Sequence, residues 1–208
     1  MLRGQREGAL AAAARRFRPR PGPGGAPLPR LLLLGDPVRL PDPRPAALRL
    51  PPGAAVLARG LAPAVLRGLA SIARRRRLVL LVAADGRLAL RHGAGLHLPD
   101  RRGTAGLLPF LLARRGRPLL LTAAAHGRAG LARARRLGAD AVLLSPVFPT
   151  ASHPGAPALG PLRWAALAQR AGRPALALGG VSGANARRLP RGAAGLAAIG
   201  AWGPARGE

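Results

Sequence analysis

The sequence predicts a single compact (β/α)8 TIM barrel, an α/β fold, with an incomplete eighth helix. Eight short apolar runs recur along the chain, each is apolar throughout, and stretches rich in Ala, Leu and Arg with helical spacing separate most of them. The runs begin near Leu31, Ala55, Leu78, Gly95, Leu119, Ala141, Ala175 and Leu196.

Runs without polar alternation are typical of strands buried on both faces, as in a parallel sheet covered by helices. Eight such units favour a barrel that closes on itself. The alternative is a doubly wound open sheet, which usually has fewer strands and a glycine-rich phosphate loop after the first. Here the first run ends in Gly35-Asp36-Pro37, which is no such loop, so we expect the barrel.

The chain of 208 residues suits one domain with a real core. We expect residues 1–29 to form an N-terminal arm with a weak helix, and residues 30–203 to form the barrel. Arg18 to Pro29 is rich in Pro, Gly and Arg and is typical of a linker.

The eighth unit lacks the length for its helix, because only eight residues follow Gly200 and one of them is Pro204. The last strand then needs another cover. We expect either an N-terminal helix over Gly8 to Phe17 or the partner in a homodimer, with Trp202 as the buried anchor.

Composition excludes several classes of protein. There is no cysteine, which excludes disulfides and thiolate chemistry, and no apolar run is long enough for a transmembrane helix. The net charge of +27 comes entirely from arginine, a bias typical of a GC-rich genome, and aromatic platforms for base stacking are lacking. We therefore expect a cytoplasmic enzyme with no nucleic-acid or membrane partner, whose basic surface suits phosphate esters.

Several side chains with chemical potential follow the predicted strands. His97 lies at the end of the fourth run and either lines the barrel or acts in a site. Asp85 follows the third run and is a candidate metal ligand or, alternatively, a turn residue before Gly86. Asp100 follows the fourth run and is a candidate metal ligand or a helix cap. His126 follows the fifth run and is a candidate acid or base, or the cap of the next helix.

The segment SPVFPTASH, Ser145 to His153, follows the sixth run and precedes the widest gap between runs. Its two hydroxyls and one basic side chain suit phosphate binding, although an ordinary surface loop is the alternative. Glycines follow the next two runs, where barrels of this class usually bind phosphate through bare backbone N–H groups. The candidate phosphate-binding residues are Thr150, Ser152, His153, Gly179, Gly180, Ile199 and Gly200.

These motifs resemble the thiamine phosphate synthase/TenI family. The family carries PVFPT after its sixth strand, preceded by LGAD, which stands here at Leu137 to Asp140. GLHLP at Gly95 resembles its GVHL, and the spacing to GGV at Gly179 and AIG at Ile199 also fits. The likeness spans roughly Leu31 to Trp202 and is densest from Leu137 onward.

The resemblance implies roles for some of these residues. Thr150, Ser152 and His153 match the loop that holds phosphate groups, with His153 where the family usually has Lys. Gly180 and Gly200 match the thiazole phosphate site. Asp85 matches the Asp of the family's Asn-Asp pair for Mg²⁺, with Ala84 in place of the Asn, and Asp100 is a shifted candidate for the second metal Asp.

Other positions depart from the family's pattern. Arg59 matches the Arg of its Gln-x-Arg-x-Lys strand, but Leu57 and Leu61 replace the Gln and Lys, and Ala124 replaces a Ser before His126. Losing one donor to a developing charge typically costs on the order of 10²–10³ in rate. We expect His126 and Arg59 to be the catalytic residues.

The resemblance implies an enzyme of thiamine biosynthesis. The first expectation is a transferase of the synthase type, which joins a pyrimidine pyrophosphate to a thiazole phosphate with Mg²⁺ and releases pyrophosphate. The alternatives are a TenI-like thiazole tautomerase and a non-catalytic barrel that binds the phosphate ligand.

Overall fold

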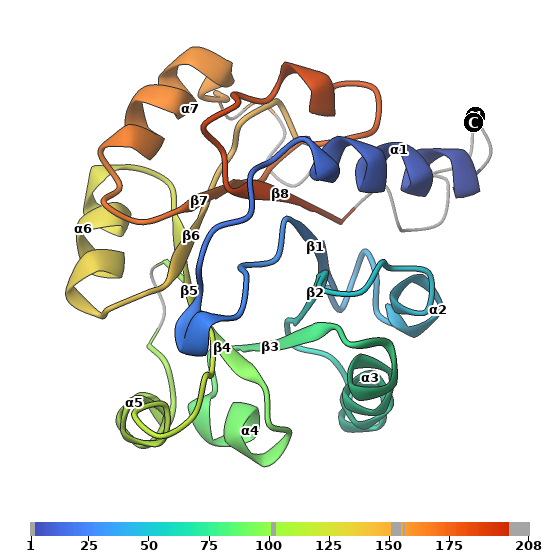
Figure 1. Cartoon of the computed structure of the whole chain (residues 1–208), viewed down its shortest axis with the longest axis vertical. Helices are drawn as coiled ribbons and strands as arrows, with labels where there is room; N and C mark the ends of the chain where they lie inside the picture. The colour runs from blue at the N-terminus through green and yellow to red at the C-terminus, as the bar shows by residue number, and fades with distance from the viewer. Residues whose placement is uncertain (1–2, 101–102, 151–154, 156, 200–208) are drawn as a thin grey trace.

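Eight parallel strands form one closed barrel (Figure 1) in the computed structural model, which describes residues 3–100, 103–150, 155 and 157–199. Neighbouring strands pair in chain order, and the barrel closes where Leu31 pairs with Leu196. The strands are β1 (Leu31–Leu34), β2 (Ala55–Ala58), β3 (Val79–Ala83), β4 (Gly95–Leu98), β5 (Leu121–Ala125), β6 (Ala141–Leu144), β7 (Ala175–Ala177) and β8 (Gly195–Ala198). The predicted fold class is confirmed, and the open sheet is excluded.

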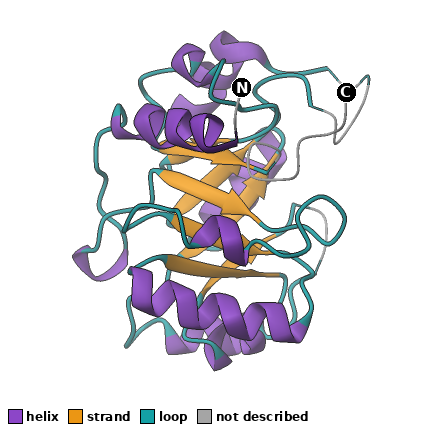
Figure 2. Cartoon of the chain, turned by 90° about the vertical axis from the view of Figure 1, so that its right-hand side faces the viewer, coloured by secondary structure: helices purple, strands orange, loops and turns teal. Residues whose placement is uncertain are grey.

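Helices surround the strands on the outside (Figure 2). They are α1 (Arg3–Arg15), α2 (Arg44–Ala47), α3 (Pro63–Arg76), α4 (Gly86–Arg91), α5 (Leu107–Ala113), α6 (Arg128–Arg136) and α7 (Gly160–Gln169), with two 3₁₀ turns, η1 (Pro23–Gly25) and η2 (Ala186–Arg188). The unit after β7 contains the short η2 in place of a full helix. The predicted gap after Gly200 and the anchor Trp202 lie outside the described residues.

The barrel is filled by aliphatic side chains, because the strands are apolar at nearly every position. All four residues of β1, β2, β4, β6 and β8 are buried. The few aromatic side chains fill gaps between strands and helices: Phe110 of α5 and Trp164 of α7 are fully buried. The Trp164 indole N–H donates a hydrogen bond to the Leu144 carbonyl (2.9 Å), which ties α7 to β6.

The LGAD segment is structural. The Asp140 carboxylate accepts hydrogen bonds from the Leu121 amide (2.7 Å) and from the Arg114 guanidinium (2.7 Å), so it links the start of β6 to β5 and to the end of α5. Gly138 has a φ of 66°, which favours glycine at this turn. The motif thus fixes the strand entry, at the end of the barrel opposite the strands' carboxyl ends.

The N-terminal helix α1 packs against β1 and η2 (Figure 1). Leu10, Ala14 and Phe17 are buried in the common core, and the Arg16 guanidinium donates hydrogen bonds to the carbonyls of Ala186 (3.3 Å) and Leu189 (3.4 Å). The sequence predicts a helix at Gly8 to Phe17 as cover for the last strand, and α1 lies on that flank. The helix thus contacts β1, which pairs with β8, and does not itself decide between the two predicted covers of the last strand.

The segment between α1 and β1 forms a small hairpin across the barrel opening (Figure 1). Pro21 pairs with Pro27 in an antiparallel bridge, and the Leu28 amide donates to the Arg20 carbonyl (2.8 Å). At the tip, a Cβ on Gly24 would lie 2.5 Å from Pro118, just before β5. Residues predicted as a linker thus lie against the amino ends of the strands.

Many arginines lie at the carboxyl ends of helices. The last turn of α3 carries Arg74, Arg75 and Arg76, and the last turn of α6 carries Arg133, Arg135 and Arg136. Cations there interact favourably with the helix dipole. The placement gives part of the basic charge a local structural role. Among the described residues, no helix has the length and apolarity needed to cross a membrane.

The packing of α1 predicts a specific loss of stability. Leu10 is fully buried, so Leu10→Ala should lower the free energy of unfolding by about 2–5 kcal/mol through lost burial and a cavity. Ala12, on the exposed face of the same helix, supplies the control, and Ala12→Ser should change it by less than about 1 kcal/mol. Urea denaturation measures both, and equal stability of the two variants would show that α1 does not contribute to the core.

Candidate active site

The carboxyl ends of the parallel strands bring the predicted residues to one rim of the barrel. Of the predicted residues, Arg59 follows β2, Asp85 follows β3 and His126 follows β5, while Thr150 lies beyond β6. Asp36, which was not among the predicted site residues, follows β1. In barrels of this class, this rim carries the active site. The topology thus assembles a site from segments far apart in the sequence.

The extension of β6 and the glycine pair after β7 are in close backbone contact. The Val147 amide donates to the Leu178 carbonyl (2.9 Å), and the Phe148 amide donates to the Gly179 carbonyl (3.1 Å). A Cβ on Gly180 would lie 2.2 Å from the Pro149 carbonyl oxygen, and Gly180 has a φ of 64°. Only glycine fits, for space and for conformation.

Thr150 directly follows Phe148 and Pro149, the two residues that contact Gly180. Ile199 is buried at the end of β8. Ser152, His153 and Gly200, which complete the predicted phosphate-binding set, lie outside the described residues.

Asn185 holds the glycine loop in shape. Its side-chain amide donates to the Gly180 carbonyl (2.8 Å), and its side-chain oxygen accepts from the Ser182 amide (2.9 Å). From the sequence, Ser182 and Asn185 are expected to cap the next helix. Asn185 does stand at the start of η2, but it makes no side-chain cap bond there and braces the loop before it.

Arg59 forms an ion pair with the buried Asp36 of the neighbouring strand. The Asp36 carboxylate also accepts hydrogen bonds from the amides of Val38 (3.1 Å) and Arg39 (3.0 Å). Burial raises the pKa of Asp36, but these amides and Arg59 outweigh it and hold the pKa below its usual value. The pair is therefore charged at neutral pH.

His97 lies inside the barrel. It is 6% exposed, and its Nδ1 shares a hydrogen bond with the Thr122 hydroxyl of β5 (2.9 Å). Burial lowers the pKa of His97 to about 3, with the positive charges of Arg59 and Arg133 adding to the effect. His97 is thus neutral at physiological pH and lines the barrel, as one of the two interpretations held.

His126 is exposed at the rim and is oriented by β6. Its Nδ1 lies 3.1 Å from the Ser145 carbonyl oxygen and 3.2 Å from the Ser145 hydroxyl. A carbonyl only accepts, so a hydrogen bond at this contact requires a proton on Nδ1 and directs Nε2 away from Ser145. Both contacts join His126 to β6 and not to α6, so the alternative role as a helix cap is not supported.

The predicted metal ligands occupy different surroundings. The Asp85 carboxylate accepts from the Leu88 amide (2.9 Å) and caps α4, a role that was not predicted from the sequence. One oxygen of Asp100 faces α6, where a Cβ on Gly130 would lie 2.8 Å from it. Across the described part of the chain, no group of three or more His, Cys, Asp or Glu side chains could hold a metal.

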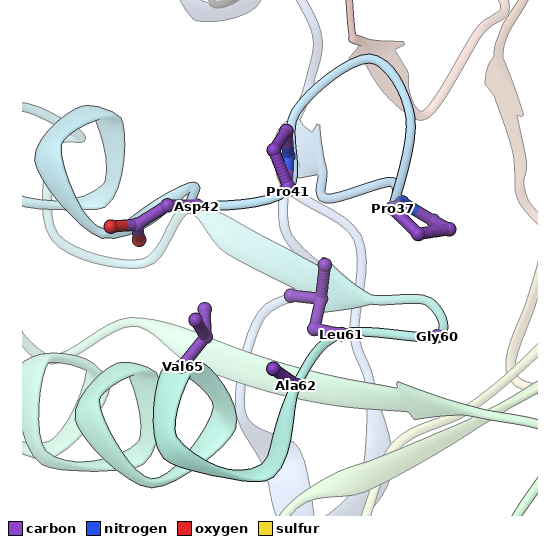
Figure 3. Close-up of a pocket in the computed structure, with 7 residues that line it drawn as sticks. All are labelled: Pro37, Pro41, Asp42, Gly60, Leu61, Ala62 and Val65. Carbon is purple, nitrogen blue, oxygen red and sulfur yellow. The ribbon is translucent and has the colours of Figure 1, made fainter.

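A cavity of about 520 Å³ opens beside this rim, between the loops after β1 and β2 (Figure 3). Pro37, Pro41, Leu61 and Val65 make it mostly apolar, and Asp42 and Gly60 complete its edge with Ala62. Leu61 thus lies in this cavity, where the family resemblance expects Lys. None of the predicted site residues lines it, but Pro37 and Gly60 in its wall directly follow Asp36 and Arg59 in the chain.

A closed (β/α)8 barrel with polar side chains at its carboxyl rim is the architecture of a large class of enzymes. Comparisons with known proteins show to which family of this class the chain belongs. Residues 60–202 match the family model for thiamine monophosphate synthase. A curated relative from Geobacter sulfurreducens, named "Putative thiamine-phosphate synthase", is 37% identical over 143 residues, which cover 61% of this chain and 67% of that protein. The chain belongs to the thiamine monophosphate synthase family, whose members are transferases of thiamine biosynthesis.

Solved structures show the same fold at lower identity. Thiamine phosphate pyrophosphorylase from Pyrococcus furiosus superposes with a TM-score of 0.67 at 23% identity, over 82% of this chain and 85% of that one. A 2-keto-3-deoxy-6-phospho-gluconate aldolase from Zymomonas mobilis superposes with a TM-score of 0.56 at 14% identity, over 91% and 85% of the two chains. At these identities the likeness concerns the fold.

The close approach of the β6 and β7 loops predicts the effect of a single methyl group. Gly180→Ala would drive a Cβ into the Pro149 carbonyl at a positive φ, so it should cost about 1–3 kcal/mol of stability and weaken phosphate binding. A Cβ on Gly192 would meet nothing within 4 Å, and Gly192→Ala should shift stability by less than about 0.5 kcal/mol. Urea denaturation and calorimetry with inorganic phosphate measure the two effects. Wild-type stability and affinity in Gly180→Ala would contradict this geometry.

Proposed function

We propose that this protein is a thiamine phosphate synthase, which joins a pyrimidine pyrophosphate to a thiazole phosphate and releases pyrophosphate. The observation that carries the proposal is the pairing of the PVFPT segment with Gly179-Gly180 at the carboxyl end of the barrel, within the region that matches the family. Two phosphorylated substrates need two anion-binding regions, and the rim offers one at β6 and β7 and a second at Arg59.

The first anion-binding region would take the thiazole phosphate. The β6 and β7 loops lie in contact, and in this proposal the Thr150 hydroxyl and the bare backbone near Gly180 would bind one phosphate together. Ser152, His153, Ile199 and Gly200 would complete this set by family resemblance. Asn185 keeps the loop in the conformation that presents its backbone.

The second region would take the pyrophosphate. When the bond between the pyrimidine carbon and the pyrophosphate oxygen breaks, negative charge grows on the leaving group. A fixed guanidinium stabilises such charge more in this state than in the substrate. Arg59 is half exposed at the rim and is the arginine that β2 supplies there.

The remaining site residues receive supporting roles in this proposal. Mg²⁺ would be held by the free oxygen of Asp85 and by Asp100, and when bound it would neutralise part of the pyrophosphate charge. His126 would offer Nε2 to a substrate hydrogen-bond donor or exchange a proton with it. His97 stays neutral and adds no charge near the substrate.

We also propose that the enzyme acts in the cytoplasm. A cytoplasmic enzyme that acts on small phosphorylated molecules fits the arginine-rich surface without a nucleic-acid partner. A homodimer remains a separate proposal, because α1 already packs on the flank that suggested it.

An assay with purified protein tests the proposed reaction directly. With both phosphorylated precursors and Mg²⁺, thiamine phosphate should form, and Arg59→Ala should lower kcat/KM by on the order of 10²–10³. Arg67→Ala, a change on the exposed surface of α3, is the control and should retain wild-type activity. Binding of both precursors without any thiamine phosphate would contradict the proposal.

A further inference from the structure

Asp36 and Arg59 are neighbours because two parallel strands continue in register past their ends. Leu34 pairs with Leu57, and the Gly35 amide donates to the Leu57 carbonyl (2.8 Å). Two residues further along each strand, side chains point to the same side again. Asp36 and Arg59 stand at these positions, so the strand register itself brings the carboxylate to the guanidinium.

The Asp36 carboxylate is held rigidly by its own turn. One oxygen accepts from the amides of Val38 and Arg39, and the Asp36 and Leu40 backbones exchange two hydrogen bonds (3.1 and 2.9 Å). The other oxygen is left to face Arg59, with the Arg39 guanidinium further away at 3.7 Å. A buried carboxylate fixed in this way is a firm anchor for a long, flexible side chain.

Arg59 keeps most of its hydrogen-bonding capacity while it is anchored. Only Nη2 contacts Asp36, and the described residues give Nε and Nη1 no partner. The side chain of Arg59 is about half exposed at the carboxyl rim, so these donors are accessible from solvent. Accessible donors of an anchored guanidinium suit the oxygens of a phosphate group.

The geometry points to Asp36 as a positioning residue that holds Arg59 at the carboxyl rim of the barrel for a pyrophosphate group. The inference rests on the proposed function, because that function brings pyrophosphate to Arg59. Leu57 and Leu61 add no polar group on β2, so this one side chain must be well placed. Two effects compete: the Asp36 charge repels an anion, whereas its anchoring reduces the entropy lost when Arg59 binds one. We expect anchoring to dominate.

Calorimetry with inorganic pyrophosphate on the full-length protein tests this inference. Asp36→Asn keeps an oxygen for the Val38 and Arg39 amides but removes the charge that holds Arg59. It should weaken pyrophosphate binding about tenfold, or about 1.4 kcal/mol, with the protein still folded by circular dichroism. Asp42→Asn is the matched control, since Asp42 pairs with Arg44 (2.8 Å) and not with Arg59, and the affinity of this variant should equal that of wild type.

A double-mutant cycle separates positioning from general destabilisation. In an Arg59→Ala background, Asp36→Asn should change the affinity less than about twofold, because Asp36 acts only through Arg59. An equal tenfold loss in that background, or wild-type or tighter binding by Asp36→Asn alone, overturns the inference and leaves the proposed function in place. Wild-type protein that binds no pyrophosphate overturns the pyrophosphate region itself, and the positioning role with it.

Discussion

The backbone contact between the end of β6 and the glycine pair after β7 is the constraint on which the candidate site depends. Hydrogen bonds from Val147 and Phe148 continue the parallel ladder beyond the strands, and Gly180 lets the Pro149 carbonyl approach where any side chain would clash. The approach brings Pro149, the residue before Thr150, against Gly180. In the proposed function, it is this contact that would let the Thr150 hydroxyl and the glycine backbone bind the same ligand.

Other contacts in the fold hold the two loops and the strands that carry them in place. Trp164 fixes α7 to the Leu144 carbonyl, at the end of the strand that carries the loop. Asp140 fixes the other end of the same strand to β5 and α5. The N-terminal helix α1 packs against η2. Asn185, the residue directly before η2, donates a hydrogen bond to the Gly180 carbonyl and so holds the glycine loop. Distant parts of the chain therefore position one loop pair.

The sequence predicted the barrel because a parallel barrel imposes a strong pattern: strands apolar at every position, separated by helical spacing. It also predicted the β6 and β7 segments, where a motif and paired glycines stand at the correct strand ends. The Asp36–Arg59 pair was missed, because it depends on strand register and on a turn that fixes the carboxylate. The alternation of side chains along a strand offered a signal for the pair. Asp36 and Arg59 each stand two positions beyond Leu34 and Leu57, which pair across the two strands, so their side chains are expected on the same side. The roles of Asn185 and Thr122 depend on side-chain geometry that no local pattern encodes.

The measurement that tests the central claim most directly is a crystal structure of the protein soaked with thiazole phosphate. The account predicts that the phosphate lies at the carboxyl rim of the barrel, between the Thr150 hydroxyl and the backbone near Gly180. Phosphate density at the amino ends of the strands, or only in the cavity lined by Pro37 and Leu61, would contradict it.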